Sequence, residues 1–246
     1  YLDNMLKNSL RDENIERAKL ELGKTLDLSV RAEHLHEQDE SDNYGIKKMK
    51  TLNLSEINTD DIKKIIRESP YKNIEIQELR NFIEDKLEKL LEENKTRIKF
   101  SERYKRIIDR YNAGNTTNEN YYEELLKFVD ELKEEDERHI REGLTVEELE
   151  LYDLLKKENL TKKEEEQVKL SARKLYEALN REDSGTKIVD WYKDEQPRQA
   201  VRFRVEEVLD EYLPDSYDKD IFNIKTDIIF THIIEKSLKN EMSYVS

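Results

Sequence analysis

The tetrapeptide DERH at residues 136–139 has the letters of the D-E-x-H box with which helicases bind magnesium and ATP. A box of that kind sits at the end of a buried apolar strand, whereas these residues follow the charged run DELKEE. The sequence also lacks the G-x-x-x-x-G-K-[ST] loop that would hold the phosphates of ATP. We therefore interpret DERH as part of a solvated helix and predict no ATP site.

Acidic residues raise a second possibility, the P-D…E-x-K motif of metal-dependent nucleases. Pro214 and Asp215 could open such a motif, but no E-x-K follows them. The E-x-K from Glu84 to Lys86 lies upstream, inside an amphipathic helical pattern. Because these nucleases place both acids on adjoining strands so that one metal bridges them, we predict no nuclease site. Pro214 and Asp215 are better explained as the stop of one helix and the start of the next.

Histidines offer little more chemistry. His34 and His36 stand beside several acids, but an i, i+2 spacing on a helix points the two rings apart, and no second His or Cys pair is present. We interpret them as part of a polar linker and predict no metal site. His232 falls at the edge of an apolar helical face, which favours a core-edge histidine over a catalytic one. We predict no catalytic residue in this chain.

The stretch RIKFSERYKRIIDRYNAG, residues 97–114, carries six basic and two acidic residues in a chain of net charge −14. At about 100° per residue, Arg103, Arg106 and Arg110 form one row of a helix, with Arg97 just upstream. Such a row could follow the phosphates of a nucleic acid or contact a protein partner. It could equally meet some of the 58 acidic residues of the same chain as exposed ion pairs, and we favour this second explanation.

A second candidate contact surface lies toward the C-terminus. Trp191 is the single tryptophan, and Arg198 and Arg202 are one helical turn apart on a different side from the neighbouring valines. Trp and Arg are common anchors of protein interfaces, so these three residues form a candidate partner interface. The alternative, which we favour for Trp191, is that its ring packs between helices.

The composition predicts an all-α fold that could position these residues. The chain has 246 residues, of which 41% are charged and 35% hydrophobic, with five Gly and three Pro, and this scarcity of turn residues favours long helices. The absence of cysteine excludes disulfides and fits the cytoplasm. No apolar run reaches the roughly 18–20 residues of a membrane span, and the missing initiator Met suggests a fragment of a longer protein.

We predict a multi-helix bundle with room for two helical subdomains. Residues 1–58 should form N-terminal helices and an acidic linker, residues 59–135 a helical subdomain with the basic helix, and residues 136–246 a C-terminal helical subdomain. Capping boxes predict helix starts at Thr145 and at Thr161. We also expect a basic helix from about residue 101 to 112, a short helix in IVDWYKDEQ (188–196), and a last helix whose apolar positions are Ile221, Ile224, Ile228 and Ile233.

Five short motifs follow one another in a specific order. They are Asn94, Arg97 and Phe100 followed by YNAG at 111–114, then GLTVEELELYDLL at 143–155, LTKKE at 160–164, DWYKDEQPRQAV at 190–201, and VLDEYLP at 208–214. From about residue 74 to 238, this order and spacing resemble the C-terminal helical region of the motor (R) subunit of type I restriction enzymes. Residues 1–58 carry none of these motifs.

The resemblance implies a parent subunit with a nuclease domain and two motor lobes that use ATP and Mg²⁺ to translocate DNA. It implies that this region docks the motor on the modification methyltransferase (M) subunit, with DNA a further partner in the full complex and no cofactor of its own. One alternative is a free-standing helical nucleic-acid-binding module. Another, a metal-dependent hydrolase, would need a metal at His34 and His36.

Overall fold

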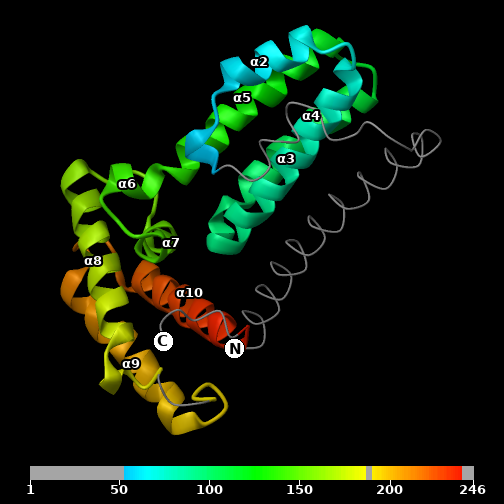
Figure 1. Ribbon diagram of the computed structural model, residues 1–246. Coiled ribbons are helices and arrows are strands. Elements are labelled where there is room, and N and C mark those ends of the chain that lie inside the picture. The colour runs from blue at the N-terminus through cyan, green and yellow to red at the C-terminus, as the bar shows by residue number, and fades with distance from the viewer. Residues whose placement is uncertain (1–52, 187–189, 240–246) are drawn as a thin grey trace. The chain divides into compact units, whose positions relative to one another are not determined.

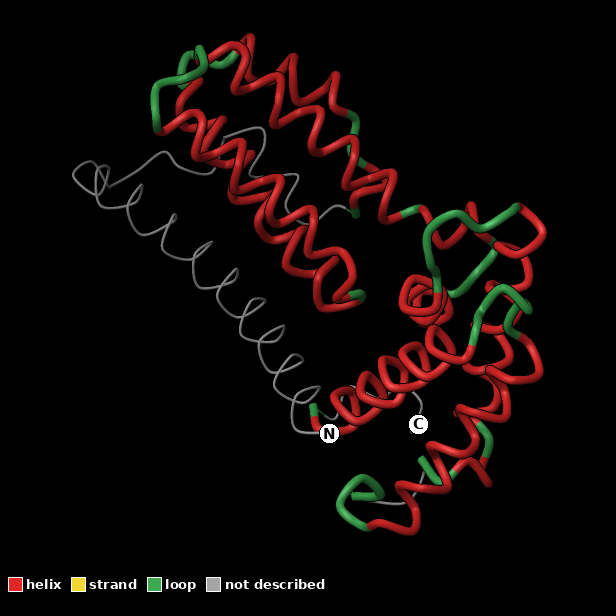
Figure 2. The backbone as a smooth tube through the Cα atoms, turned by 180° about the vertical axis from the view of Figure 1, so that it is seen from behind, coloured by secondary structure: helices red, strands yellow, loops and turns green. Residues whose placement is uncertain are grey.

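A computed structural model describes residues 53–186 and 190–239 (Figure 1). Within those ranges the chain forms nine α-helices and no strand, which confirms the all-α prediction (Figure 2). The chain divides into two compact units, Tyr1–Arg138 and His139–Ser246. The predicted helices and linker of residues 1–52, with His34 and His36, lie outside the described residues.

Unit 1 is built around α5, which packs against α2, α3 and α4 (Figure 1). Apolar side chains recur on the inner face of each helix and form one core, with Leu79 and Ile83 of α3 and Leu125 and Val129 of α5 fully buried. The helices of this unit are α2 (Thr59–Glu68), α3 (Lys72–Glu93), α4 (Ile98–Asn112) and α5 (Asn118–Asp136), with 3-10 turns η3 (Leu54–Glu56) and η4 (Lys95–Arg97).

The basic helix α4 begins three residues earlier than expected. The side chain of Asn94 accepts a hydrogen bond from the Thr96 amide, at 3.0 Å, and the 3-10 turn that follows leads directly into α4. At its other end, Gly114 has a φ of 70°, and Thr117 then caps α5 by accepting from the Asn120 amide. This short connection makes α4 and α5 antiparallel neighbours.

Unit 2 has its own core between α7, α8, α9 and α10. Both predicted capping boxes are present: Thr145 caps α7 with Glu148, and Thr161 caps α8 with Glu164. The helices are α6 (Arg138–Glu142), α7 (Val146–Leu155), α8 (Lys162–Asn180), α9 (Glu195–Tyr212) and α10 (Lys219–Leu238), with the 3-10 turn η5 (Glu182–Ser184). No helix of the described residues is long and apolar enough to cross a membrane.

Two details of unit 2 differ from the sequence prediction. Residues 190–194 form a turn, and α9 begins only at Glu195, so the short helix expected at 188–196 is wrong at residues 190–194. Asp190 has a φ of 58°, and a left-handed residue interrupts a right-handed helix. In α10, Ile233 is fully buried whereas Ile224 is 57% exposed, so the isoleucines of this helix occupy two faces.

Candidate nucleic-acid and partner interfaces

Two of the three arginines in the α4 row meet acidic residues of α5. Arg103 Nη2 lies 2.6 Å from Glu131 Oε1, and Arg110 Nη2 lies 2.7 Å from Glu124 Oε2. Both arginine side chains remain about half exposed, so each pair contributes little to stability. At these two positions the structure agrees with the favoured explanation, ion pairing within the chain.

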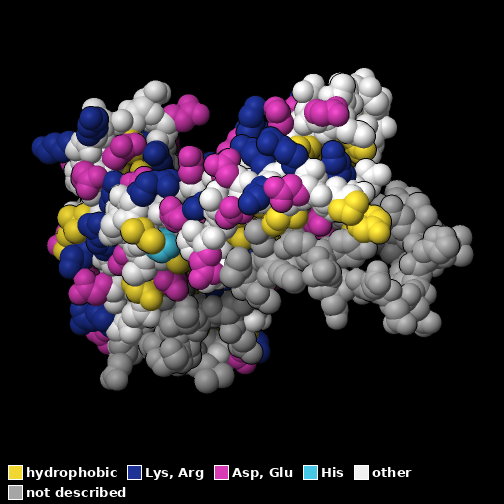
Figure 3. Space-filling model, turned by 45° about the horizontal axis from the view of Figure 1, so that its top comes forward, with side chains coloured by type: hydrophobic (Ala, Val, Ile, Leu, Met, Phe, Trp, Pro, Cys, Tyr) yellow, Lys and Arg dark blue, Asp and Glu magenta, His cyan; other side chains and the backbone are white. Residues whose placement is uncertain are grey.

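Arg106, between these two, has no ion pair with any residue that the structure describes. It lines an open groove of about 680 Å³ between α4 and α5, and Lys127 of α5 lines the same groove. Figure 3 shows Lys and Arg side chains gathered on one face of unit 1, interspersed with acidic ones. The remaining residues that line the groove are Arg103, Ile107, Asp109, Arg110 and Glu124.

Sequence reasoning missed Lys127 as a member of this surface. Its signal was present, because Glu124, Lys127 and Glu131 recur at i, i+3 and i+7 and therefore form one row of α5. That row becomes part of a groove only when α5 packs against α4. The register of two helices cannot be predicted from the sequence of either helix alone. Asp109 of α4 also lines the groove.

Arg97 is a buried structural residue. Its Nε lies 3.0 Å from Glu135 Oε1, and its Nη1 lies 3.3 Å from Glu93 Oε2 and donates to the carbonyl oxygen of Leu90. The side chain is 2% exposed, so Arg97 is separated from the exposed row that it precedes in the sequence. In this structure it is unavailable for contact with DNA or a partner.

Glu84, the acid of the upstream E-x-K, is also buried in unit 1. It accepts a hydrogen bond of 2.7 Å from the Tyr104 hydroxyl. Burial raises the pKa of the Glu84 carboxyl, although Tyr104 and Arg80 oppose the shift. Glu84 lies on α3, and Pro214 and Asp215 lie between α9 and α10, so neither acid is on a strand. This arrangement does not reproduce the paired strand carboxylates of the nuclease motif.

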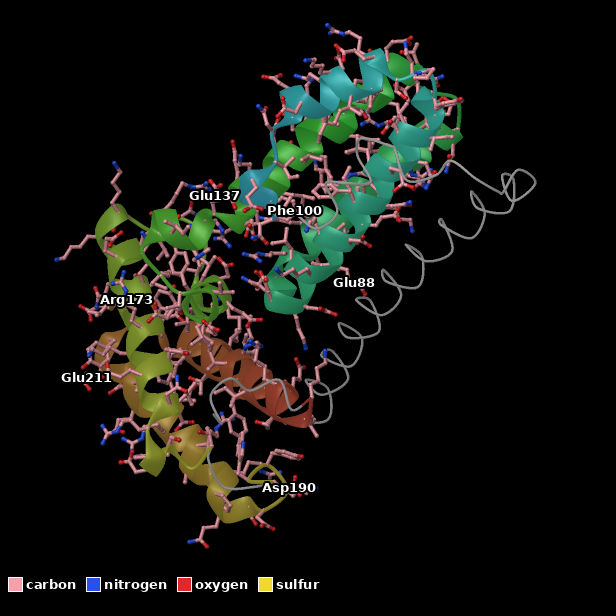
Figure 4. The ribbon with its side chains drawn as sticks, viewed as in Figure 1. Glu88, Phe100, Glu137, Arg173, Asp190 and Glu211 are labelled. Carbon is pink, nitrogen blue, oxygen red and sulfur yellow. The ribbon has the colours of Figure 1, made fainter. Side chains whose placement is uncertain are left out.

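The DERH letters lie at a junction between two helices. α5 ends at Asp136, Glu137 follows as its C-cap, and α6 begins at Arg138 (Figure 4). In the described residues that precede them, 53–135, the structure has helices and turns and no strand. No group of three or more His, Asp or Glu residues suited to a metal ion occurs in the described part of the chain.

Trp191 belongs to the core of unit 2. Its ring is 2% exposed and lies 6.2 Å from the Phe230 ring, and its Nε1 donates to Ser237 Oγ at 3.1 Å. The favoured explanation, packing between helices, therefore describes its place in the structure. A ring buried to this extent cannot anchor a partner without unfolding its surroundings.

The two arginines of the same candidate interface differ from each other. Arg202 Nη2 lies 2.7 Å from Asp227 and its Nε lies 3.0 Å from Glu206, so it joins α9 to α10. Its guanidinium also lies over the Phe230 ring. Arg198 is half-buried and forms no ion pair with a described residue. The structure therefore does not combine these three residues into one exposed patch.

A buried charged cluster joins α7 to α10 in unit 2. Glu150 Oε2 lies 2.5 Å from Lys236 Nζ and 3.4 Å from His232 Nε2. Burial would raise the pKa of the Glu150 carboxyl, but the positive charges and hydrogen bonds of His232 and Lys236 outweigh it and lower the pKa to about 2. A carboxylate with so low a pKa is a poor proton acceptor near neutral pH, which fits a structural role. His232 is accordingly a buried core residue.

Two apolar residues on the outer side of α10 are largely exposed, a feature that the sequence-based prediction did not single out. Ile224 is 57% exposed and Leu238 60% exposed, and both lie on the side opposite the fully buried Ile229 and Ile233. Together with Ile228, Thr231 and Glu235 they follow a spacing of four and three residues and form one outer row. Within this row Ile228 is partly buried against the core of unit 2, and Glu235 is charged. Three of the five members of this outer row are therefore apolar, and two of these, Ile224 and Leu238, are available to a partner.

Comparison with known proteins agrees with the motif analysis. The family model described as "Type I restriction enzyme HindI endonuclease subunit-like, C-terminal" matches residues 4–236. No curated protein and no solved structure gives a match.

Proposed function

Because it belongs to the family of C-terminal regions of type I restriction enzyme HindI-like endonuclease subunits, we propose that this chain docks its subunit on the modification methyltransferase. In this proposal the region is an assembly element without a catalytic site or cofactor of its own. ATP, Mg²⁺ and the cutting of DNA belong to other parts of the parent subunit, and the complex acts in the cytoplasm.

The observation that carries the proposal is the exposure of two apolar residues, Ile224 and Leu238, in the outer row of α10. A helix buries one stripe in its own unit, and α10 does so with Ile229 and Ile233. On the opposite side Ile224 and Leu238 are more than half exposed and are not among the residues packed against the core of unit 2. From Ile224 to Leu238 the row spans about 21 Å at 1.5 Å per residue, a length suited to a facing helix.

The use of the motif residues also supports an assembly role. Arg97 is bound to Glu135 inside unit 1, Trp191 is packed inside unit 2, and Thr145 and Thr161 cap helices. In the described part of the chain all four have structural contacts of this kind. Residues that maintain two helical units are what a docking element requires.

The charge of the chain favours a partner with a basic surface around an apolar centre. The formal net charge is −14, and the exposed Asp220 lies in the first turn of the helix that carries the outer row. Charge complementarity raises the association rate, whereas the exposed apolar residues of the outer row would supply most of the affinity. We therefore expect association with the methyltransferase to slow as the salt concentration rises.

The test of this surface is a pull-down of the modification subunit by the whole chain and by a variant with Ile224→Glu and Leu238→Glu. Both positions are exposed, so the variant should keep its helical circular dichroism spectrum. We expect it to lose at least about ten-fold in affinity, because two charges would be buried at an apolar contact. Leu170→Glu, an exposed leucine of α8 in the same unit, is the matched control and should bind normally.

Equal binding by the parent chain and the double variant would exclude the outer row of α10 as the docking surface. Equal loss in the double variant and in Leu170→Glu would show a general effect of added negative charge, and would also count against the proposal.

A further inference from the structure

The α4 and α5 rows face each other as a ladder with three levels. Arg110 pairs with Glu124 at one end and Arg103 with Glu131 at the other. The outer members of each row are seven positions apart, and the two helices run antiparallel. These two ion pairs therefore fix the register of α4 against α5. The middle member of the α4 row is Arg106, and the middle member of the α5 row is Lys127.

This middle level brings together two positive charges where the outer levels each have an opposite pair. Both side chains are exposed, both line the same groove, and neither has an ion pair with a described residue. The acidic residues within reach along the helix, Glu102 and Asp109, form no ion pair with Arg106 either. Two cations that line one groove repel each other, and an anion bound between them would relieve this repulsion.

We propose that this groove binds a phosphate of the DNA backbone, with Arg106 and Lys127 donating hydrogen bonds to the phosphate oxygens. Arg103 and Arg110, held by Glu131 and Glu124, flank the site and shape its rim. A guanidinium and an ammonium group are the side chains that most often contact phosphates. At about 680 Å³, the groove has room for a phosphate and part of its neighbouring nucleotides.

The lining of the groove favours a nucleic acid over a protein partner. Six of the seven lining residues are charged, and Ile107 is the one apolar member. Protein interfaces are depleted in charge at their centre, where an apolar or aromatic anchor fills a pocket. A phosphate chain needs only cations along its path. The two acids in the lining, Asp109 and Glu124, limit the site to a local contact, in keeping with the acidic chain.

The proposal is tested by measuring the anisotropy of a short fluorescent DNA duplex with the whole chain at several salt concentrations. Arg106→Gln combined with Lys127→Gln should weaken binding about ten-fold and lower the slope of log K against log salt by about one phosphate contact. The matched control is Lys162→Gln with Lys163→Gln, which removes the same charge from exposed positions of α8 and should bind like the parent chain.

A second measurement guards against a folding artefact. Inorganic phosphate should raise the melting temperature of the parent chain and leave that of the Arg106→Gln, Lys127→Gln variant unchanged, because only the parent has the anion site. Without phosphate, the variant should melt no lower than the parent, since a like-charge repulsion has been removed.

Three results would overturn the site. They are unchanged DNA binding by the double variant, an equal loss in the Lys162, Lys163 control, and displacement of the duplex by polyglutamate at equal charge concentration, which would indicate an acidic protein partner. The site does not depend on the docking proposal, because it lies in unit 1 and the docking row lies on α10. The variants at Arg106 and Lys127 and those at Ile224 and Leu238 therefore test the two proposals independently.

Discussion

Arg97 and Glu135 form an ion pair inside unit 1, with Nε 3.0 Å from Oε1 and with side chains that are 2% and 7% exposed. The pair joins the residue before α4 to the last turn of α5, at the end of the α4–α5 hairpin that lies away from its loop. Arg138 also contacts Glu135, at 3.0 Å, so the carboxylate holds two cations. This network fixes the two helices on which the proposed phosphate site is built.

Replacing Arg97 by Ala should destabilise unit 1 by about 3 kcal/mol, because it leaves Glu135 buried with one of its two cationic partners removed. Arg103→Ala, which breaks an exposed pair of the same hairpin, should cost less than about 1 kcal/mol. Urea unfolding followed by circular dichroism measures both. Similar losses in the two variants would mean that burial of the Arg97 pair has no energetic consequence.

Trp191→Ala should destabilise unit 2 by about 3–5 kcal/mol, since it removes a large buried ring from a packed core. Trp191→Phe keeps most of the ring volume but loses the hydrogen bond to Ser237, so it should cost about 1 kcal/mol from that bond together with a smaller packing loss. Thermal unfolding by circular dichroism separates the two variants. A loss near zero for Trp191→Ala would place the ring at the surface, where it could serve as an interface anchor.

Unit 2 should lose stability in acid through Glu150. The carboxyl has a pKa of about 2 in the folded chain against an ordinary value of 4.5. A group whose pKa is lower in the folded state stabilises fully above the unfolded pKa, and its contribution disappears as the pH falls from about 4.5 toward 2. For Glu150 this contribution is on the order of 3 kcal/mol.

The test compares the parent chain with Glu150→Gln, using Trp191 fluorescence because this residue reports on unit 2. The difference in stability between them should be largest near neutral pH and should shrink below pH 4.5. Glu158→Gln, at an exposed position, should follow the parent at every pH. A difference between Glu150→Gln and the parent that stays constant down to pH 2 would show that His232 and Lys236 do not hold the carboxylate.

Much of the fold could be predicted from the sequence because its signals are local. The capping boxes at Thr145 and Thr161 are set by residues three positions apart, and both are present. The turn at residues 190–194 was missed, because its cause is the left-handed conformation of Asp190 and nothing in the amino-acid type requires that conformation. The earlier start of α4 depends on the Asn94 side chain, which could equally have turned to solvent.

The candidate sites depended on pairing between helices, and there the sequence was less informative. The arginine row of α4 was correctly placed on one helix face, but the separation of Arg106 from its paired neighbours required the register with α5. Similarly, Ile224 and Ile233 both fit an apolar helix, and only the packing of α10 shows that one is exposed and the other buried. The burial of Arg97 could not be predicted from the sequence either, since its partner Glu135 lies 38 residues away along the chain.

The central claim is that this region docks the motor on the methyltransferase, and its most direct test is a titration of the whole chain with the purified modification subunit. Isothermal titration calorimetry and sedimentation velocity should both show a specific complex in the absence of the motor lobes. Its association rate should fall as salt rises, because the acidic chain steers a basic partner surface. A chain that is helical by circular dichroism but forms no complex with the modification subunit at any salt concentration would contradict the docking function.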